Sequence, residues 1–326
     1  MRRLLALGVA IALVAIAVVI RNGIDSGRNG GNGSGAGGGK LRLVCTPELE
    51  EACRSLGSDV DVRVEEPGAT ADVLESAGND LGLDGWLTPG PWPQIVADAR
   101  RRDGKDPLLD VKQMTVRSKI GLAVWPDRLA VLRGFCPNHD VSWHCLGDAA
   151  ARGKWGDIGG QATWGPVKFA IPNPSTNATG LVALGAATAG YFGRADLSST
   201  DLDNTGFRAW LRALATSDAD HPSLGEVLAT GPAEAAAAAT IDAVGAPLVR
   251  AYAGQQKPVL TYPAPVASAD VVLGSAGTDR GRRLRALVED AGRAALKGRG
   301  WLDGAGSGLP SAGLLDALRA VWEDAR

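Results

Sequence analysis

The sequence predicts an α/β protein preceded by a membrane segment. Three observations carry this prediction: an uncharged apolar run at the N-terminus, a glycine-rich tract after it, and strand-like segments that alternate with helix-like segments from residue 41 onward. Such alternation is typical of parallel strands joined by helical crossovers. The alternating part is long enough for two lobes or domains.

The apolar run extends from Leu4 to Ile20, with Arg2 and Arg3 before it and Arg21 after it. At about 1.5 Å per residue a helix over this run would cover roughly 25 Å, near the short end of what spans a bilayer core. It ends without the small residues of a cleavage site. We therefore expect residues 1–22 to be an uncleaved transmembrane signal anchor, with a cleaved signal peptide as the alternative. Residues 23–40 read as a flexible linker.

The positive-inside rule gives a mild preference for a cytoplasmic N-terminus. The four cysteines add to it, because they form two local pairs, Cys45 with Cys53 and Cys136 with Cys145, and an even count in an exported chain indicates disulfides. The alternatives are reduced core thiols and, for the second pair, a zinc site with His139 and His144. We expect a single-pass protein of the cell membrane whose folded part is extracytoplasmic.

The elements follow from local patterns. Leu41–Cys45 is a short apolar strand, and Pro47 with the acidic residues 48–51 marks a helix start. Residues 60–64 alternate with period two, and residues 119–125 are continuously apolar, as in a strand buried on both faces. Further strands are predicted at 83–87, 167–171, 240–244, 258–262 and 270–273. Further helices are predicted at 71–77, 92–102, from Gly180 to 192, and at 207–215, 233–239, 282–296 and 311–324.

Groups for catalysis are scarce. His139, His144 and His221 are the chain's three histidines, and none has the spacing of a metal site or a catalytic triad. No phosphate-binding or dinucleotide-binding glycine motif is present. The net charge of −2 and the lack of a basic stripe argue against nucleic acid as a partner. We expect no enzyme activity, no cofactor and no metal.

Small polar residues recur beside the predicted strands. Thr46, Thr70 and Thr88 follow the first three strands, and Ser118 precedes the long buried one. In open α/β sheets ligands bind beyond the carboxyl ends of strands, so these side chains could converge on one cleft. Each taken alone is more readily a helix cap. Trp86 could stack on a ligand, and a core tryptophan is an equally good interpretation.

The segment from Asn173 to Gly180 combines a strand exit, hydroxyl and amide side chains, and a helix start. Free backbone N–H groups at such a helix N-terminus favour an anion or a polar ligand. Asn177 and Thr179 would line that end. Ordinary N-capping is the alternative interpretation.

The order of these segments resembles extracellular solute-binding proteins of the type 2 periplasmic-binding fold, in the molybdate- and sulfate-binding group, and in particular a membrane-anchored actinobacterial form. The segments that carry the resemblance are LRLVCTPEL, VRSKIGLAVWP, SWHCLGD, KFAIPNPSTNATGLVAL, LTYPAPVASADVVL and ALKGRGWLDG. The resemblance implies two lobes, each a mixed sheet flanked by helices, joined by two crossing strands. Lobe 1 would comprise residues 41–118 plus 262–326, and lobe 2 residues 119–261.

The resemblance also implies a ligand held between the lobes. Lobe 1 or its hinge would contribute Thr46, Thr70, Thr88 and Ser118. Lobe 2 would contribute Thr176, Asn177, Thr179 and Thr240. The chain departs from oxyanion-binding members in one respect: Ala239-Thr240-Ile241-Asp242 stands where they place a tyrosine. No arginine or lysine evidently enters the cleft, so a tetrahedral oxyanion is not favoured.

We therefore expect a membrane-tethered solute-binding protein that captures a small polar ligand by hinge closure. The resemblance allows an ABC transporter permease as a partner. A second hypothesis is a cell-surface interaction or sensor protein that uses the same scaffold without transporting a solute. A third is an extracytoplasmic hydrolase, which would need a histidine beside a serine or an aspartate in the cleft.

Overall fold

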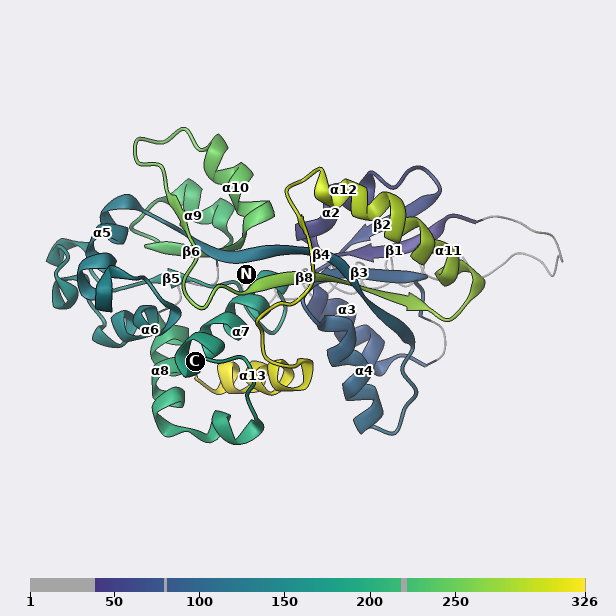
Figure 1. Ribbon diagram of the computed structural model, residues 1–326, viewed down its shortest axis with the longest axis horizontal. Helices are drawn as coiled ribbons and strands as arrows, with labels where there is room; N and C mark the ends of the chain where they lie inside the picture. Colours follow the sequence, from purple (N-terminus) through teal and green to yellow (C-terminus); the bar gives the residue numbers. More distant parts are fainter. Residues whose placement is uncertain (1–38, 79–80, 218–221, 326) are drawn as a thin grey trace, which may run out of the picture. The chain divides into compact units, whose positions relative to one another are not determined.

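The centre of the protein is one mixed sheet whose strands run in the order β2-β1-β3-β8-β4-β6-β5 (Figure 1). The computed structural model describes residues 39–78, 81–217 and 222–325. The predicted anchor lies outside these residues, as does the predicted linker except for Gly39 and Lys40. The strands on this path are β1 (Leu41–Cys45), β2 (Val60–Val64), β3 (Gly85–Pro89), β4 (Leu109–Val124), β5 (Phe169–Ala170), β6 (Ala237–Ile241) and β8 (Ser268–Ala276). Two more strands, β7 (Val259–Thr261) and β9 (Leu302–Asp303), pair with β4.

Strand β4 belongs to both halves of the sheet. Its residues 109–119 pair antiparallel with β8, and its residues 120–124 pair antiparallel with β6 and β7. The chain thus crosses between the halves once within β4 and again through residues 262–267, between β7 and β8. We call the half built on β1, β2, β3, β8 and β9 lobe 1, and the half built on β5, β6 and β7 lobe 2.

Helices cover the sheet in both lobes (Figure 1). In lobe 1 they are η1 (Pro47–Leu49), α2 (Glu50–Arg54), α3 (Pro67–Ser76), α4 (Trp92–Arg102), α11 (Asp279–Leu287), the π-helical η6 (Val288–Gly292) and α12 (Arg293–Lys297). In lobe 2 they are α5 (Pro126–Phe135), η2 (Pro137–His139), α6 (Trp143–Arg152), η3 (Trp155–Ile158), η4 (Ala162–Trp164), α7 (Ala178–Phe192), η5 (Ser199–Asp203), α8 (Thr205–Thr216), α9 (Leu224–Thr230) and α10 (Asp242–Ala251).

The last helix, α13 (Ala312–Ala325), contacts elements of both lobes. It packs against α4 of lobe 1 and against α7 and α8 of lobe 2. Arg319 of α13 lies over the ring of Trp92, 4.7 Å from its centre, and donates a hydrogen bond to the carbonyl of Ser175 at 3.1 Å. The last helix therefore connects the two lobes, and Arg319 contacts both of them.

Alanine-rich residues 233–239 were expected to form a helix, and this expectation is wrong. Ala237–Ala239 lie in strand β6, which is buried between β4 and β5. The small side chains allow α7 to pack directly against β6. Alanine favours helices in isolation, but sheet pairing and close packing decide its conformation here.

In the described ranges no helix is long and apolar enough to cross a membrane.

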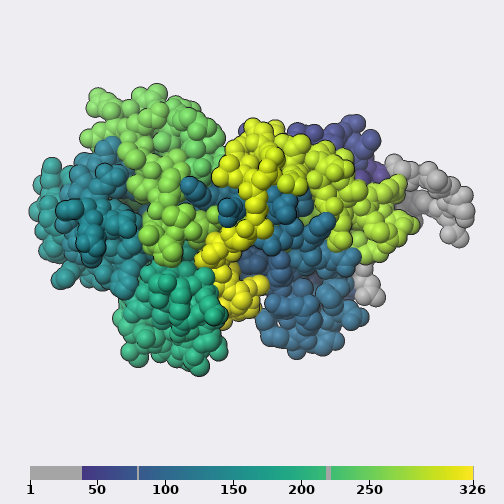
Figure 2. Space-filling model, viewed as in Figure 1, coloured from purple at the N-terminus to yellow at the C-terminus, as the bar shows by residue number. Residues whose placement is uncertain are grey.

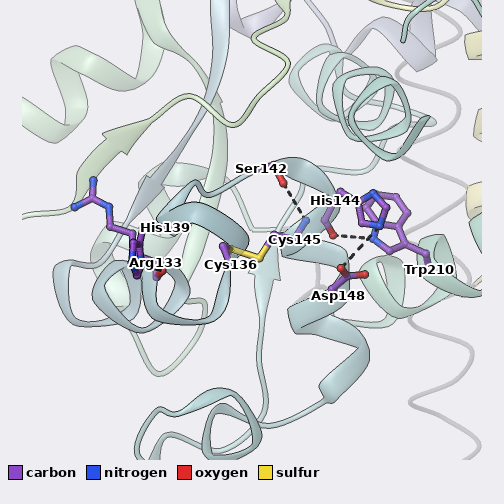
Figure 3. The surroundings of a disulfide bond; sticks show 8 residues. All are labelled: Arg133, Cys136, His139, Ser142, His144, Cys145, Asp148 and Trp210. Carbon is purple, nitrogen blue, oxygen red and sulfur yellow. Dashed lines mark hydrogen bonds and ion pairs between the residues drawn. A yellow bond between two sulfur atoms is a disulfide. The ribbon is translucent and has the colours of Figure 1, made fainter. Parts of the chain in front are cut away.

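Both predicted disulfides are confirmed. Cys45–Cys53 joins the end of β1 to α2, and Cys136–Cys145 joins the residue after α5 to α6. Figure 3 shows the second bond, with His139 and His144 pointing away from it. Nδ1 of His139 is 2.9 Å from the carbonyl oxygen of Arg133, and His144 stacks on Tyr191. Among the described residues no cluster of three potential metal ligands occurs, so the zinc alternative has no support here.

Candidate functional site

A groove of about 310 Å³ lies between the lobes, where the chain leaves β1 and β2 and where α7 begins. We call it the interlobe groove. Lobe 1 lines it with Pro47, Glu48 and Glu66. Lobe 2 lines it with Pro172, Asn177, Thr179, Ser223, Leu224, Gly225, Ala239, Thr240, Val244 and Leu248. A neighbouring cavity of about 340 Å³ shares Pro47, Glu48, Val244 and Leu248 with it and continues toward Arg299 and Trp301.

The sequence explains why polar groups gather here. Glu48 lies in the single turn η1, which follows β1 directly and has a proline at its first position. Glu66 precedes α3, which also starts with proline. Asn177 caps α7, since its side-chain oxygen accepts a hydrogen bond from the N–H of Gly180 at 3.0 Å. A Cβ at Gly180 would lie 1.9 Å from the carbonyl oxygen of Pro172, so only glycine allows this tight entry into the helix.

Hydrogen bonds cross the groove from lobe 2 to the glutamates of lobe 1. One carboxylate oxygen of Glu48, Oε1, accepts from both the backbone N–H and the hydroxyl of Thr179, at 3.1 and 2.9 Å. The amide of Asn177 donates to Glu66 at 3.1 Å. The N–H of Gly68 in α3 donates to the carbonyl of Thr176 at 3.0 Å. A carboxylate of the protein thus occupies the N-terminus of α7, the position at which an anion or a polar ligand was expected.

The groove is acidic. Of the described residues that line it, only Glu48 and Glu66 have ionisable side chains, and both are acids. Burial raises the pKa of Glu66, the negative charge of Glu48 raises it further, and the hydrogen bond from Asn177 acts in the opposite direction. The second oxygen of Glu48, Oε2, is buried without a hydrogen-bond partner. A positively charged occupant would offset the repulsion between Glu48 and Glu66. Its N–H or O–H donors could also bond to the unpartnered Oε2 of Glu48.

The structure brings some of the predicted ligand residues to this groove. Asn177, Thr179 and Thr240 line it. Thr176 contributes its backbone carbonyl to the contact between the lobes, as described above. Ligand binding by these residues stays a prediction.

The remaining predicted residues are buried, and the side chains of three of them, Thr70, Thr88 and Ser118, form hydrogen bonds within the protein, whereas Oγ1 of Thr46 and Nε1 of Trp86 have no hydrogen-bond partner. Thr70 donates to Glu65 at 3.2 Å, and the hydroxyl of Thr88 donates to the neighbouring carbonyl of Pro89 at 3.1 Å. The hydroxyl of Ser118 accepts from the N–H of Ala243 at 2.9 Å, which links β4 to α10. Thr46 and Trp86 are fully buried. None of these five is among the described residues that line the groove.

Sequence reasoning missed Glu48, Glu66 and Ser223. Glu48 and Glu66 come shortly after β1 and β2, so the rule that singled out Thr46 and Thr70 applies to them equally. In the sequence, the acidic residues 48–51 indicate only a helix start. For the hydrolase hypothesis, neither His139 nor His144 lines the groove, and His221 lies outside the described residues.

No protein-family model matches the chain. No curated protein matches it either. Solved structures of similar fold include a periplasmic thiamin binding protein, with 9% identity over 87% of this chain and 95% of that one and a TM-score of 0.55. The periplasmic binding protein AfuA from Actinobacillus pleuropneumoniae, with exogenous fructose-6-phosphate bound, shares 14% identity over 83% and 86%, with a TM-score of 0.52. The sulfate-binding protein SubI from Mycobacterium tuberculosis H37Rv shares 11% identity over 81% and 86%, with a TM-score of 0.50.

At these identities the likeness shows the fold and not the ligand. The three proteins differ in what their names say they bind, while each covers most of this chain. The sheet order, the two crossings and the groove between the halves agree with that likeness. The chain therefore has the two-lobed fold of the periplasmic binding proteins, as its sequence predicted.

Proposed function

We propose that this chain is an extracytoplasmic solute-binding protein, tethered to the cell membrane by its N-terminal segment, that captures a small ligand in the interlobe groove. The groove itself supports the proposal most strongly, since it lies between the lobes of a binding-protein fold and combines apolar walls with a few converging polar groups. The tether rests on the sequence of residues 1–22. A permease of an ABC transporter would receive the ligand.

The charges of the groove favour a ligand with a positive charge. Glu48 and Glu66 both face it, and Glu48 already fills the N-terminus of α7. An anion would meet two carboxylates and would have to displace one of them from Thr179. A cation would pair with Glu48 and Glu66, while its apolar part would pack against Pro172, Leu224 and Val244. A volume of about 310 Å³ suits a small organic molecule.

Binding in this site requires no chemical step. The groove offers two acids and several hydroxyls, and no histidine, lysine or cysteine is among its described lining residues. Ligand contacts to both lobes favour the closed arrangement by the difference in affinity between the closed and open states. When the lobes close, the chain would bend in the crossing strand β4 and in residues 262–267.

A thermal-shift screen of the full-length protein tests this proposal. The library pairs each small organic cation with a neutral and an anionic analogue of the same shape. We expect a cation to raise the melting temperature, and the shift to vanish in Glu48→Gln/Glu66→Gln. The control is Glu289→Gln, which removes a carboxylate that pairs with Lys112 on the surface. If no member of the library shifts the wild type, or if anions shift it most, the proposal is wrong.

The direct bonds between the lobes favour a second candidate function, a cell-surface interaction or sensor protein. Besides the contacts across the groove, Ser175 donates to Glu323 of α13 at 2.6 Å. Hydrogen bonds of this kind stabilise the closed arrangement of the two lobes, whose outer surface would then contact a partner protein. In that case the screen finds no ligand, while Glu48→Ala still lowers stability.

A further inference from the structure

A second pocket, of about 220 Å³, lies beside the strands that cross between the lobes. We call it the hinge pocket. Its lining residues are Gly90, Pro91, Gln94, Gln113, Asp270, Val272, Ser307, Leu309, Pro310 and Ala312. They come from the turn between β3 and α4, from α4, from the strands β4 and β8, and from the segment between β9 and α13 with the first residue of α13. The two pockets share no lining residue.

The segment that closes the hinge pocket, residues 304–311, is fixed to the crossing strands. The N–H of Gly304 donates to the carbonyl of Thr115 in β4 at 3.1 Å, and the N–H of Ser268 in β8 donates to the carbonyl of Ser307 at 2.8 Å. Figure 1 shows this segment passing over β4 and β8 between α12 and α13, and Figure 2 shows its atoms on the surface. The pairing register of β4 with β8 shifts between Gln113 and Arg117, at the same place. Such irregularities often lie next to functional sites.

Asp270 is the charged group of this pocket, and it is 6% exposed. One oxygen, Oδ2, accepts hydrogen bonds from the side-chain amide of Gln113 and from the N–H of Gly306, the latter at 3.2 Å. Both donors are neutral. The other oxygen, Oδ1, is buried without any hydrogen-bond partner.

Arg117, the basic group whose charge acts on Asp270, does not form an ion pair with it in the described structure. Its guanidinium donates to the carbonyl of Gly306 at 3.2 Å. Burial raises the pKa of Asp270, whereas the N–H of Gly306, the charge of Arg117 and the amide of Gln113 oppose this rise. The carboxylate is therefore desolvated and left with one free acceptor.

Gln94 adds a second free acceptor to the same pocket. Its side-chain oxygen is buried without a partner. The other walls are mostly apolar, with Pro91, Val272 and Leu309 among them. Two unsatisfied acceptors, one of them a carboxylate oxygen, in a cavity with mostly apolar walls fit an occupant that has N–H donors, a positive charge and a short hydrocarbon part.

We propose that the hinge pocket is a second binding site, which takes the primary ammonium group of a small organic cation. The ammonium would donate to Oδ1 of Asp270 and to the side-chain oxygen of Gln94, and its alkyl part would lie against Pro91 and Leu309. Water also supplies donors, but it does not neutralise the buried charge of Asp270. This site is independent of the interlobe groove and of the function proposed for it.

The test uses full-length protein with n-propylammonium as the probe, and n-propanol and propionate as its neutral and anionic counterparts. All measurements are made in the Glu48→Gln/Glu66→Gln background, so that binding in the groove does not contribute. Saturation-transfer NMR and titration give the dissociation constant. We expect n-propylammonium to bind, with n-propanol and propionate at least tenfold weaker.

Two variants locate the probe. Asp270→Asn should weaken the binding of n-propylammonium at least tenfold. Gln94→Leu, which leaves the carboxylate of Asp270 in place, should weaken this binding about threefold or more. If Asp270→Asn does not fold, Gln94→Leu alone decides. Equal binding of n-propanol, no binding of n-propylammonium, or unchanged affinity in the variants that fold would overturn the proposal and leave a water-filled cavity. None of these results bears on the groove, whose ligand is tested in the wild-type background.

Discussion

The hydrogen bonds between Glu48 and Thr179 should couple the stabilities of the two lobes. Glu48→Ala removes both bonds from Thr179 and the favourable position of a carboxylate at the start of α7. A hydrogen bond to a charged group contributes about 1.5–3 kcal/mol when buried, and a charge at a helix terminus about 0.3–1 kcal/mol. Glu48 is only partly buried, so we expect Glu48→Ala to lower the free energy of unfolding by about 2 kcal/mol.

A double-mutant cycle isolates the bond to the hydroxyl. Thr179→Val keeps the backbone N–H and the shape of the side chain but loses the hydroxyl that donates to Glu48 at 2.9 Å. We expect Thr179→Val alone to lower the free energy of unfolding by about 1 kcal/mol. In the Glu48→Ala background the same change should lower it very little, so the coupling energy between the two residues should be about 1 kcal/mol.

Urea unfolding of the full-length protein, followed by tryptophan fluorescence, measures all four corners of this cycle. Glu50→Ala is the matched control, because Glu50 pairs with Arg54 within the exposed part of α2 and makes no bond to the other lobe. We expect that change to cost less than about 0.5 kcal/mol. If Glu48→Ala and Thr179→Val add within about 0.4 kcal/mol, the bond between the lobes does not contribute and the reasoning fails.

Three further predictions concern residues of lobe 1. Asp84, which is 2% exposed, accepts from Nη2 of Arg280 at 2.8 Å and from the N–H of Arg42 at 2.7 Å, so Asp84→Asn should lower the unfolding free energy by about 2–3 kcal/mol in urea titrations. Burial alone would raise the pKa of Asp84, but these hydrogen bonds and the charge of Arg280 lower it overall, so its stabilisation is present above about pH 4 and is lost as the pH falls below that value. Unfolding free energies between about pH 2 and 6 should therefore fall more steeply for the wild type than for Asp84→Asn, and parallel curves would contradict this. Replacing Cys45 and Cys53 by serine removes a disulfide between residues with a sequence separation of 8. From the loop entropy of the unfolded chain, we expect the free energy of unfolding to fall by about 2.5 kcal/mol. A fall of less than about 1 kcal/mol would show that this bond is not a main source of stability.

The sequence was informative about the fold because its signals were local and repeated. The apolar strand Leu41–Cys45, the helix Trp92–Arg102 and the cysteine pairs all lie where they were predicted. The alanine-rich segment 233–239 was not predicted correctly, because its conformation depends on pairing with β4, which is distant in sequence.

The site was predicted less completely, for a geometric reason. A position after a strand indicates that a residue is near the edge of the sheet, but the direction of its side chain depends on how the chain turns there. Thr46 points into the core, whereas Glu48, two residues later, faces the groove. The partners of Glu48 and Glu66 lie in lobe 2, more than one hundred residues away in sequence, so no local pattern could reveal them.

Charge selectivity in the interlobe groove is measured most directly by equilibrium dialysis of the full-length protein against a mixture of small metabolites, with mass spectrometry of what the protein retains. If the groove binds an organic cation through Glu48 and Glu66, the wild type and Glu289→Gln retain a positively charged molecule, and Glu48→Gln/Glu66→Gln does not. Retention of anions instead, or the same retention by all three proteins, would contradict a cation site in the groove.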